Sequence, residues 1–212
     1  MIDYIKQALR FFALTATVPL LIGFLGAWSF GFGFLLIILG IPAAFAVLAV
    51  GAIMWLIRGV KLSIPDAAKI KRGVAICISP LLFTATLMVS LPMLGAGSFL
   101  GSLTRLLVNH GHYEKIVAKA QASRSTALFE KDNGVTYSTD TGPPVRVAFN
   151  PEGLLDNWSG IIYDPTGDVM LAKGYDEKTG KFYAPPRVTG LFGGQLMACM
   201  HLWRDYYRCG FT

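Results

Sequence analysis

Charged side chains are missing from two long stretches of this chain. Residues 11 to 57 and residues 73 to 104 contain no Asp, Glu, Lys or Arg. Each stretch is longer than the ~20 apolar residues that cross a bilayer as a helix, and the first is long enough to cross it twice. A water-soluble fold of 212 residues cannot bury so much uninterrupted apolar surface, so the sequence predicts an integral membrane protein.

The same stretches lack the ionisable groups at membrane depth that ion pumps and secondary carriers use. Their polar side chains are hydroxyls and one thiol, all able to bond back to their own helix. We therefore interpret the apolar half as an anchor. A pore or carrier subunit is the alternative, in which its Pro- and Gly-rich helices line a path with partner subunits that supply polar groups.

Three spans fit these two stretches. The segment of residues 27 to 33 combines the interfacial aromatic Trp28 with turn-prone Ser and Gly residues, so the first stretch should turn there. A cleaved signal peptide is the rival interpretation of the first span, but its apolar run exceeds the usual ~7–15 residues and no A-x-A site follows. The spans then lie in a three-helix membrane anchor of residues 1 to 107, at about residues 9 to 28, 33 to 57 and 74 to 100.

Basic residues flank the spans unevenly. The N-terminal segment carries Lys6 and Arg10, and the connector of residues 58 to 73 carries five more basic side chains. With three spans these two segments lie on one side of the membrane, which the positive-inside rule makes the cytoplasm. The sequence therefore predicts a cytoplasmic N-terminus and a C-terminal domain on the opposite side.

The C-terminal half is electrically neutral. Residues 108 to 212 hold eleven basic and eleven acidic side chains, so the net charge of +6 comes from the membrane flanks. A nucleic-acid-binding domain would need Lys and Arg clustered in its soluble part. The sequence therefore excludes nucleic acid as a partner.

Short β-branched and aromatic runs separated by turn signals follow residue 132. We expect a connecting helix over residues 108 to 131, stopped by Asp132-Asn133-Gly134, and then a β domain over residues 132 to 212. Asp164-Pro165-Thr166-Gly167 has the composition of a type I turn and should join two strands as a hairpin. Candidate strands are residues 135 to 139, 145 to 149, 159 to 163, 169 to 172 and two runs near the C-terminus. The fold class is an α+β membrane protein, with three transmembrane helices followed by a small antiparallel β-rich soluble domain.

The last two strands carry two of the three cysteines. Residues 195 to 203 are apolar on both faces, as expected of a central strand. If the chain turns back at Arg204, Cys199 and Cys209 lie directly opposite each other, at the short end of the separation that a disulfide accepts. Free buried thiols are one alternative. A zinc site from Cys199, His201 and Cys209 is another, although no C-x-x-C or paired His spacing supports it.

Catalytic motifs do not stand out in the soluble half. The glycine-rich segment of residues 190 to 194 lacks the spacing of a phosphate-binding loop. His110 and His112 fit the polar tail of a membrane helix better than a metal site. We therefore expect no catalytic, cofactor or metal site.

Two sets of residues are candidates for packing contacts. Gly97 and Gly101 form a G-x-x-x-G pattern that lets two helices approach closely, either within one chain, which we favour, or in a dimer. Trp158, Tyr206 and Tyr207 are the aromatic residues that we expect to be exposed at a protein interface, because aromatics dominate interface hot spots.

A resemblance covers about residues 145 to 212. It is carried by LDNW at 155 to 158, YDPTG at 163 to 167, LFGG at 191 to 194, and Cys199, HLW, Cys209 and FT in the last strands. With these strings the region resembles the C-terminal module of small uncharacterised proteobacterial proteins, to which no activity is attached. The resemblance implies a bacterial envelope protein.

The expected function is that of a membrane-anchored periplasmic interaction or accessory subunit of a bacterial envelope complex. Its partners would be the lipid bilayer of the inner membrane and another membrane protein of the envelope. One alternative is an envelope enzyme that depends on Cys199, His201 and Asp205. The other is the pore or carrier subunit described above.

Overall fold

The computed structural model of the chain describes residues 2–63, 69–123, 125–154 and 156–212. The chain divides into two compact units, Met1–Gly101 and Ser102–Thr212. The first is helical, and the second combines the end of a helix with a β-sheet. The basic connector predicted at residues 58 to 73 lies partly outside the described residues.

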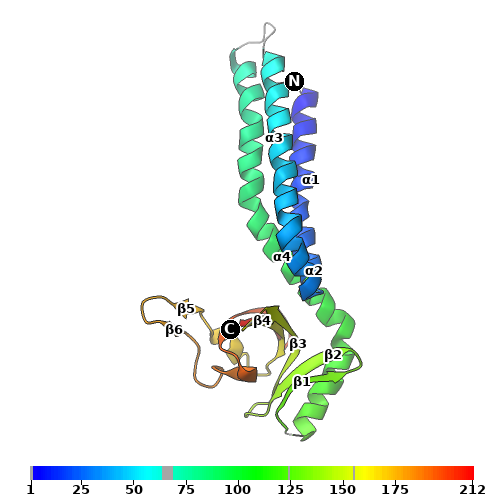
Figure 1. Cartoon of the computed structure of the whole chain (residues 1–212), viewed down its shortest axis with the longest axis vertical. Coiled ribbons are helices and arrows are strands. Elements are labelled where there is room, and N and C mark those ends of the chain that lie inside the picture. Colours follow the sequence, from blue (N-terminus) through cyan, green and yellow to red (C-terminus); the bar gives the residue numbers. More distant parts are fainter. Residues whose placement is uncertain (1, 64–68, 124, 155) are drawn as a thin grey trace. The chain divides into compact units, whose positions relative to one another are not determined.

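Three long apolar helices form the N-terminal unit and run side by side in Figure 1. All three are long and apolar enough to cross a membrane. The first is α1 (Ile2–Gly26), and the second joins α2 (Phe30–Leu35), a π-helical turn (Leu36–Gly40) and α3 (Ile41–Ser63). The third is the first part of α4 (Lys69–Ser123), which continues into the second unit.

The turn predicted within residues 27 to 33 is confirmed at residues 27 to 29, whereas the rest of that segment belongs to helix α2. The chain reverses between Gly26 and Phe30, where the Ser29 hydroxyl accepts a hydrogen bond from the Phe32 amide at 3.5 Å. A serine at this position caps the next helix because it satisfies a free amide of the first turn.

The α1 and α4 backbones touch where their small residues meet. A Cβ atom at Gly97 would collide with the Leu20 carbonyl, and one at Gly101 would collide with the Phe24 carbonyl. The G-x-x-x-G pattern therefore packs two helices of the same chain, as we favoured.

Hydrogen bonds between helices connect the end of the bundle that contains Tyr4. Tyr4 Oη lies 2.8 Å from the Trp55 carbonyl oxygen and 3.1 Å from that of Ala75, and Ser79 Oγ donates to the Ala52 carbonyl at 2.7 Å. These bonds join α1, α3 and α4. In an apolar surrounding they satisfy polar groups that would otherwise be costly to bury.

Six antiparallel strands form the main sheet of the C-terminal unit, in the order β1-β2-β3-β4-β8-β7. A separate hairpin pairs two short strands, β5 and β6, and two 3₁₀ helices, η2 and η3, lie in the long connections. The bounds are β1 (Ala127–Asp132), β2 (Val135–Asp140), β3 (Arg146–Leu154), β4 (Asn157–Tyr163), η2 (Asp168–Leu171), β5 (Tyr175–Asp176), β6 (Lys181–Phe182), η3 (Leu191–Gly193), β7 (Leu196–Trp203) and β8 (Tyr206–Phe211).

Both faces of the sheet are covered. Side chains alternate along a strand, so Phe149 of β3 faces α4, where its ring stacks on Tyr113 with centroids 4.1 Å apart. Its neighbour Ala148 faces the other way, into a core with Ile162 and Val188 from the long connections and neighbouring strands. Burial on both faces explains why β3 carries the continuous apolar run Val147-Ala148-Phe149.

The predicted connecting helix over residues 108 to 131 is wrong in its last part. Helix α4 ends at Ser123, and residues 127–131 belong to strand β1. β1 pairs with β2 through a two-residue turn in which Asn133 and Gly134 have φ angles of +44° and +83°. Asn-Gly is the preferred sequence for such a hairpin turn, so this dipeptide signals a hairpin here and not a helix stop.

The predicted strand at residues 169 to 172 is also wrong. The turn at Asp164 forms, with the Gly167 amide bonded to the Asp164 carbonyl at 3.3 Å, but it leads into η2 instead of a hairpin. The Asp164 carboxylate accepts a hydrogen bond from the Val169 amide at 3.0 Å, and this bond holds the chain in a helical turn. A turn at residues 176 to 180 joins β5 and β6.

The strand that contains Cys199 is an edge strand, not a central one. β7 pairs with β8 on one side, and on the other side the Gly174 amide donates to the Met197 carbonyl at 2.7 Å. A connecting loop thus covers part of this edge. Such cover is a common protection of strand edges, and it lets the strand be apolar on both faces.

Candidate functional site

An open groove of about 720 Å³ lies in the C-terminal unit. It is lined by Leu128 and Phe129 of β1, by Asp156 and Trp158, and by residues 192 to 195 and Thr212. These segments are far apart in the sequence, and the fold brings them together. The groove is large enough to hold several side chains of a bound partner.

A β-bulge presents the two apolar residues on the β1 side. Leu128 and Phe129 are 54% and 60% exposed, and they fall where the register between β1 and β2 shifts. Phe129 has a φ of +55°, a conformation that is strained for an aromatic residue. Ser138 and Thr139 of β2 stabilise it, because their hydroxyls accept the Phe129 and Ala127 amides at 3.0 and 2.8 Å.

Stacked aromatic rings support the part of the groove that Trp158 lines. The Trp158 indole stacks on the Phe211 ring with centroids 4.0 Å apart, and Phe192 meets both rings edge to face. Gly194 fits against this stack, since a Cβ there would lie 3.0 Å from the indole Nε1. The glycine-rich segment therefore serves close packing against Trp158. Of the three aromatics predicted at an interface, this one lines the groove.

Tyr206 and Tyr207 are not exposed, contrary to expectation. Their relative exposures are 3% and 8%, because β8 is an inner strand with both faces covered. Tyr206 lies among the rings of His110 and Tyr163, with centroid distances of 5.7 and 5.5 Å, and burial raises its pKa well above the usual value. Tyr207 packs in the core on the other face. Neither side chain offers an interface surface.

The predicted cysteine pair is confirmed as a disulfide. Cys199 and Cys209 are register partners in the β7–β8 hairpin, with Cα atoms 4.1 Å apart. A bonded sulfur is neither a nucleophile nor a zinc ligand. His201 Nε2 lies instead 2.7 Å from the Arg204 carbonyl oxygen. Cys77 of α4 is a free cysteine.

The two histidines after the third span point to different partners. His110 Nε2 lies 3.4 Å from a Glu114 carboxylate oxygen, with its ring against Trp203. His112 Nε2 lies 3.1 Å from the Asp132 carbonyl oxygen. Within the described residues, no three His, Cys, Asp or Glu side chains are grouped to hold a metal ion.

A buried ion pair fixes the turn after β4. Arg146 Nε donates to the Asp164 carboxylate at 3.0 Å, and both side chains are almost completely buried. On the outside of this pair, Arg187 donates two hydrogen bonds to Asp168 and thereby holds the pKa of that carboxyl below its usual value. This network was not anticipated from the sequence. It positions η2 and contains no nucleophile.

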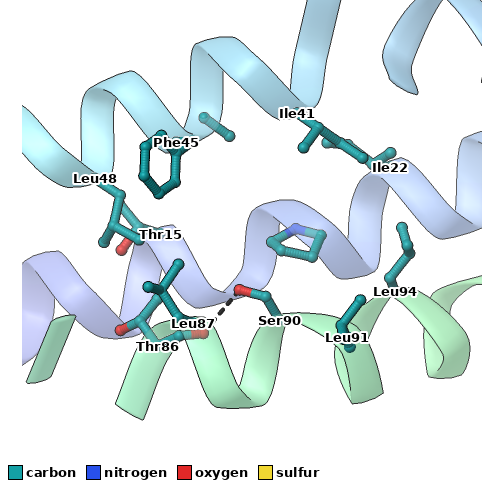
Figure 2. Close-up of a pocket in the computed structure, with 12 residues that line it drawn as sticks. Thr15, Ile22, Ile41, Phe45, Leu48, Thr86, Leu87, Ser90, Leu91 and Leu94 are labelled. Carbon is teal, nitrogen blue, oxygen red and sulfur yellow. Dashed lines mark hydrogen bonds between the residues drawn. The ribbon is translucent and has the colours of Figure 1, made fainter. Parts of the chain in front are cut away.

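The N-terminal unit contains an apolar cavity of about 150 Å³ among its three helices (Figure 2). Three hydroxyls line it, but each bonds to a carbonyl of its own helix: Thr15 to Phe12, Thr86 to Leu82, and Ser90 to Thr86. The remaining lining is apolar. The cavity therefore suits a hydrocarbon chain and offers no ligand set for an ion.

The chain was compared with known protein families, with curated proteins and with solved structures, and none of these comparisons gives a match.

Proposed function

We propose that this chain is a membrane-anchored accessory subunit whose C-terminal unit binds another protein of the bacterial envelope. The three apolar helices insert in the inner membrane, with the N-terminus in the cytoplasm and the C-terminal unit in the periplasm. The basic flanks of the first and second spans favour this orientation. The disulfide favours it as well, because disulfides persist in the oxidising periplasm.

The groove between Phe129 and Trp158 is the observation that carries the proposal. An aromatic side chain that is 60% exposed and held in a strained conformation is costly to maintain, and strain of this kind concentrates at functional sites. The same groove is lined by Trp158, whose ring stacks on Phe211. An exposed aromatic beside a rigid apolar wall is the arrangement of a binding hot spot.

The geometry of β1 indicates what the partner presents. β1 is the first strand of the sheet order, so its outer side can pair with an added extended segment. The partner segment would place an apolar side chain between Phe129 and Trp158. A basic side chain would lie near the Asp156 carboxylate, which is the charged group of the groove. The occupant is therefore an extended segment of an envelope protein with an apolar residue close to Lys or Arg.

Site-specific photocrosslinking in cells tests the proposal. A photoreactive amino acid at Phe129 should crosslink one envelope protein, whereas the same group at Tyr183, which is 59% exposed, should not. The captured partner is then purified, and its affinity for the full chain in detergent is measured with wild type and with Phe129→Asp. Loss of one hot-spot aromatic should weaken binding at least tenfold. Equal crosslinking at both positions, or equal affinity of Phe129→Asp, would refute the proposal.

No contact among the described residues supports the enzyme or the carrier alternative. The thiol-dependent enzyme needs an ionised Cys199, whose sulfur is bonded to Cys209. The carrier needs polar groups that face a path, whereas Thr86 and Ser90 bond to their own helix.

A further inference from the structure

The apolar cavity among the three helices of the N-terminal unit is lined by both buried and exposed side chains. Ile22 of α1 and Leu48 of α3 are buried, whereas Phe45 of α3 and Leu91 of α4 are exposed. Figure 2 shows these four side chains around the same space. The cavity therefore extends from the outer surface of the bundle to side chains in its interior.

Irregular helix turns border this cavity. The π-helical turn begins at Leu36, whose carbonyl accepts a hydrogen bond from the amide of Ile41, a lining residue. Gly40 ends this turn against α1, since a Cβ atom there would lie 3.6 Å from Ile22 Cδ1. Pro19, inside α1, also lines the cavity and has no N–H for a helical hydrogen bond. π-helical turns are rare and occur frequently at functional sites, which makes this cavity a candidate site.

The chemistry of the lining indicates the class of ligand. Its three hydroxyls, those of Thr15, Thr86 and Ser90, each donate to a carbonyl oxygen of their own helix. Their hydrogens are thus already used within the helices. None of the twelve lining residues is charged. A hydrocarbon has no polar atom to satisfy, so it is the ligand that this lining suits.

The size of the cavity narrows the choice of hydrocarbon. Its volume is about 150 Å³. An apolar cavity of about this volume stays dry and binds benzene, so it holds about six carbon atoms. An α-helix with its side chains is about 10 Å across, so a helix of a partner protein does not fit inside. The end of an alkyl chain does.

The position of the cavity indicates where such a chain comes from. The lining residues fall within residues 15 to 22, 41 to 48 and 86 to 94, and each of these segments lies inside one of the three proposed spans. In a bilayer, the medium around these segments consists of lipid acyl chains. An empty cavity forfeits the dispersion contacts of its walls, and an acyl chain that enters restores them.

We propose that this cavity binds the end of one acyl chain of a membrane phospholipid, which enters beside Phe45 and Leu91 and reaches Ile22 and Leu48. The chain fills the space that the π-helical turn and Pro19 border. The inference rests on the membrane insertion of the proposed function, but not on its protein partner.

Photolabelling from within a bilayer tests the site. The full chain is reconstituted in phosphatidylcholine vesicles, in which a small fraction of the lipid carries a diazirine at the end of one acyl chain. After illumination, mass spectrometry locates the labelled residues. Labels on the buried pair, Ile22 and Leu48, are compared with labels on an exposed pair, Leu14 and Val47. Resistance to alkaline extraction measures membrane insertion separately.

Two variants fill the cavity from different helices. Ala44→Phe adds a ring from α3, and Ser90→Leu adds a smaller apolar side chain from α4. The matched control is Ala46→Phe, which adds the same ring at an exposed position of α3 outside the lining. Wild type and the control should carry labels on the buried pair. Both filling variants should lose these labels and keep those on the exposed pair.

The opposite results would overturn the site. Labels on the exposed pair alone in wild type would mean that the lipid only surrounds the bundle. Labels on the buried pair that persist in both filling variants would not come from the cavity, and their loss in Ala46→Phe as well would be a general effect of an added ring. Extraction by alkali would overturn the membrane insertion and this inference with it, whereas an inserted chain without labels on the buried pair would overturn the acyl-chain site alone.

Discussion

Removing the disulfide should destabilise the C-terminal unit by a calculable amount. Cys199 and Cys209 are ten positions apart, so their bond closes a short loop. The chain-entropy model gives about −9 cal/mol/K for a loop of this length, or about 2.7 kcal/mol at 25 °C. The exchange Cys199→Ala with Cys209→Ala should lower the free energy of unfolding by this amount. With a denaturation slope of roughly 1–3 kcal/mol/M in urea, the midpoint should fall by about 1–3 M.

Hydrogen exchange of peptides from β8, measured in increasing urea on the full chain in detergent, reports this unfolding without interference from the helices of the first unit. Wild type with a reducing agent should behave like the double variant. Cys77→Ala is the control, because Cys77 is free and lies in the other unit. A midpoint shift below ~0.3 M in the double variant would show that the bond does not stabilise the unit. The loop-entropy reasoning would then be refuted.

Three further changes have expected outcomes. Asp164→Ala should cost about 3–5 kcal/mol in a urea melt, because it leaves the buried Arg146 charge without its main partner, and a loss below ~1 kcal/mol would contradict this. Gly97→Leu should separate α1 from α4, which a pair of spin labels on these helices would detect as a longer distance, whereas an unchanged distance would show that the backbones do not touch. Since Arg187 lowers the pKa of Asp168, this pair contributes fully at neutral pH and loses its contribution only as the pH falls through the lowered pKa, below the ordinary 3.8. Arg187→Gln should reduce that acid-dependent component in unfolding measured from pH 2 to 6, because Arg187 is the largest cause of the lowered pKa, and a pH profile identical to wild type would contradict the assignment.

The parts of the fold that sequence alone predicts are those with strong local signals. Two charge-free stretches gave the three apolar helices, since charge is excluded from long membrane-compatible segments. The cysteine pair followed from period-two alternation on either side of the turn at Arg204. Both signals depend on neighbours in the sequence.

The errors arose where distant residues decide the structure. Asn133-Gly134 fits both the end of a helix and a hairpin turn, and the pairing of β1 with β2 settles it as a turn. Tyr206 and Tyr207 look like interface aromatics until β8 is placed inside the sheet.

The candidate sites were even less accessible to prediction from sequence. Trp158 was identified because aromatics favour interfaces, but Phe129 was hidden in an expected helix. Phe129 and Trp158 are 29 positions apart, and Trp158 and Phe211 are 53 apart. No spacing rule links residues at such separations, so only the folded chain shows that they meet.

The two margins of the main sheet differ in their capacity for growth. The β7 margin is occupied at Met197 by the Gly174 amide, whereas β1 ends the sheet order on the other side. A sheet with one free edge can pair with one added strand. It can take up a single partner segment, or join one other copy margin to margin, and growth then stops. Fibrous polymerisation requires two receptive margins on every copy, so the cover at Met197 works against it.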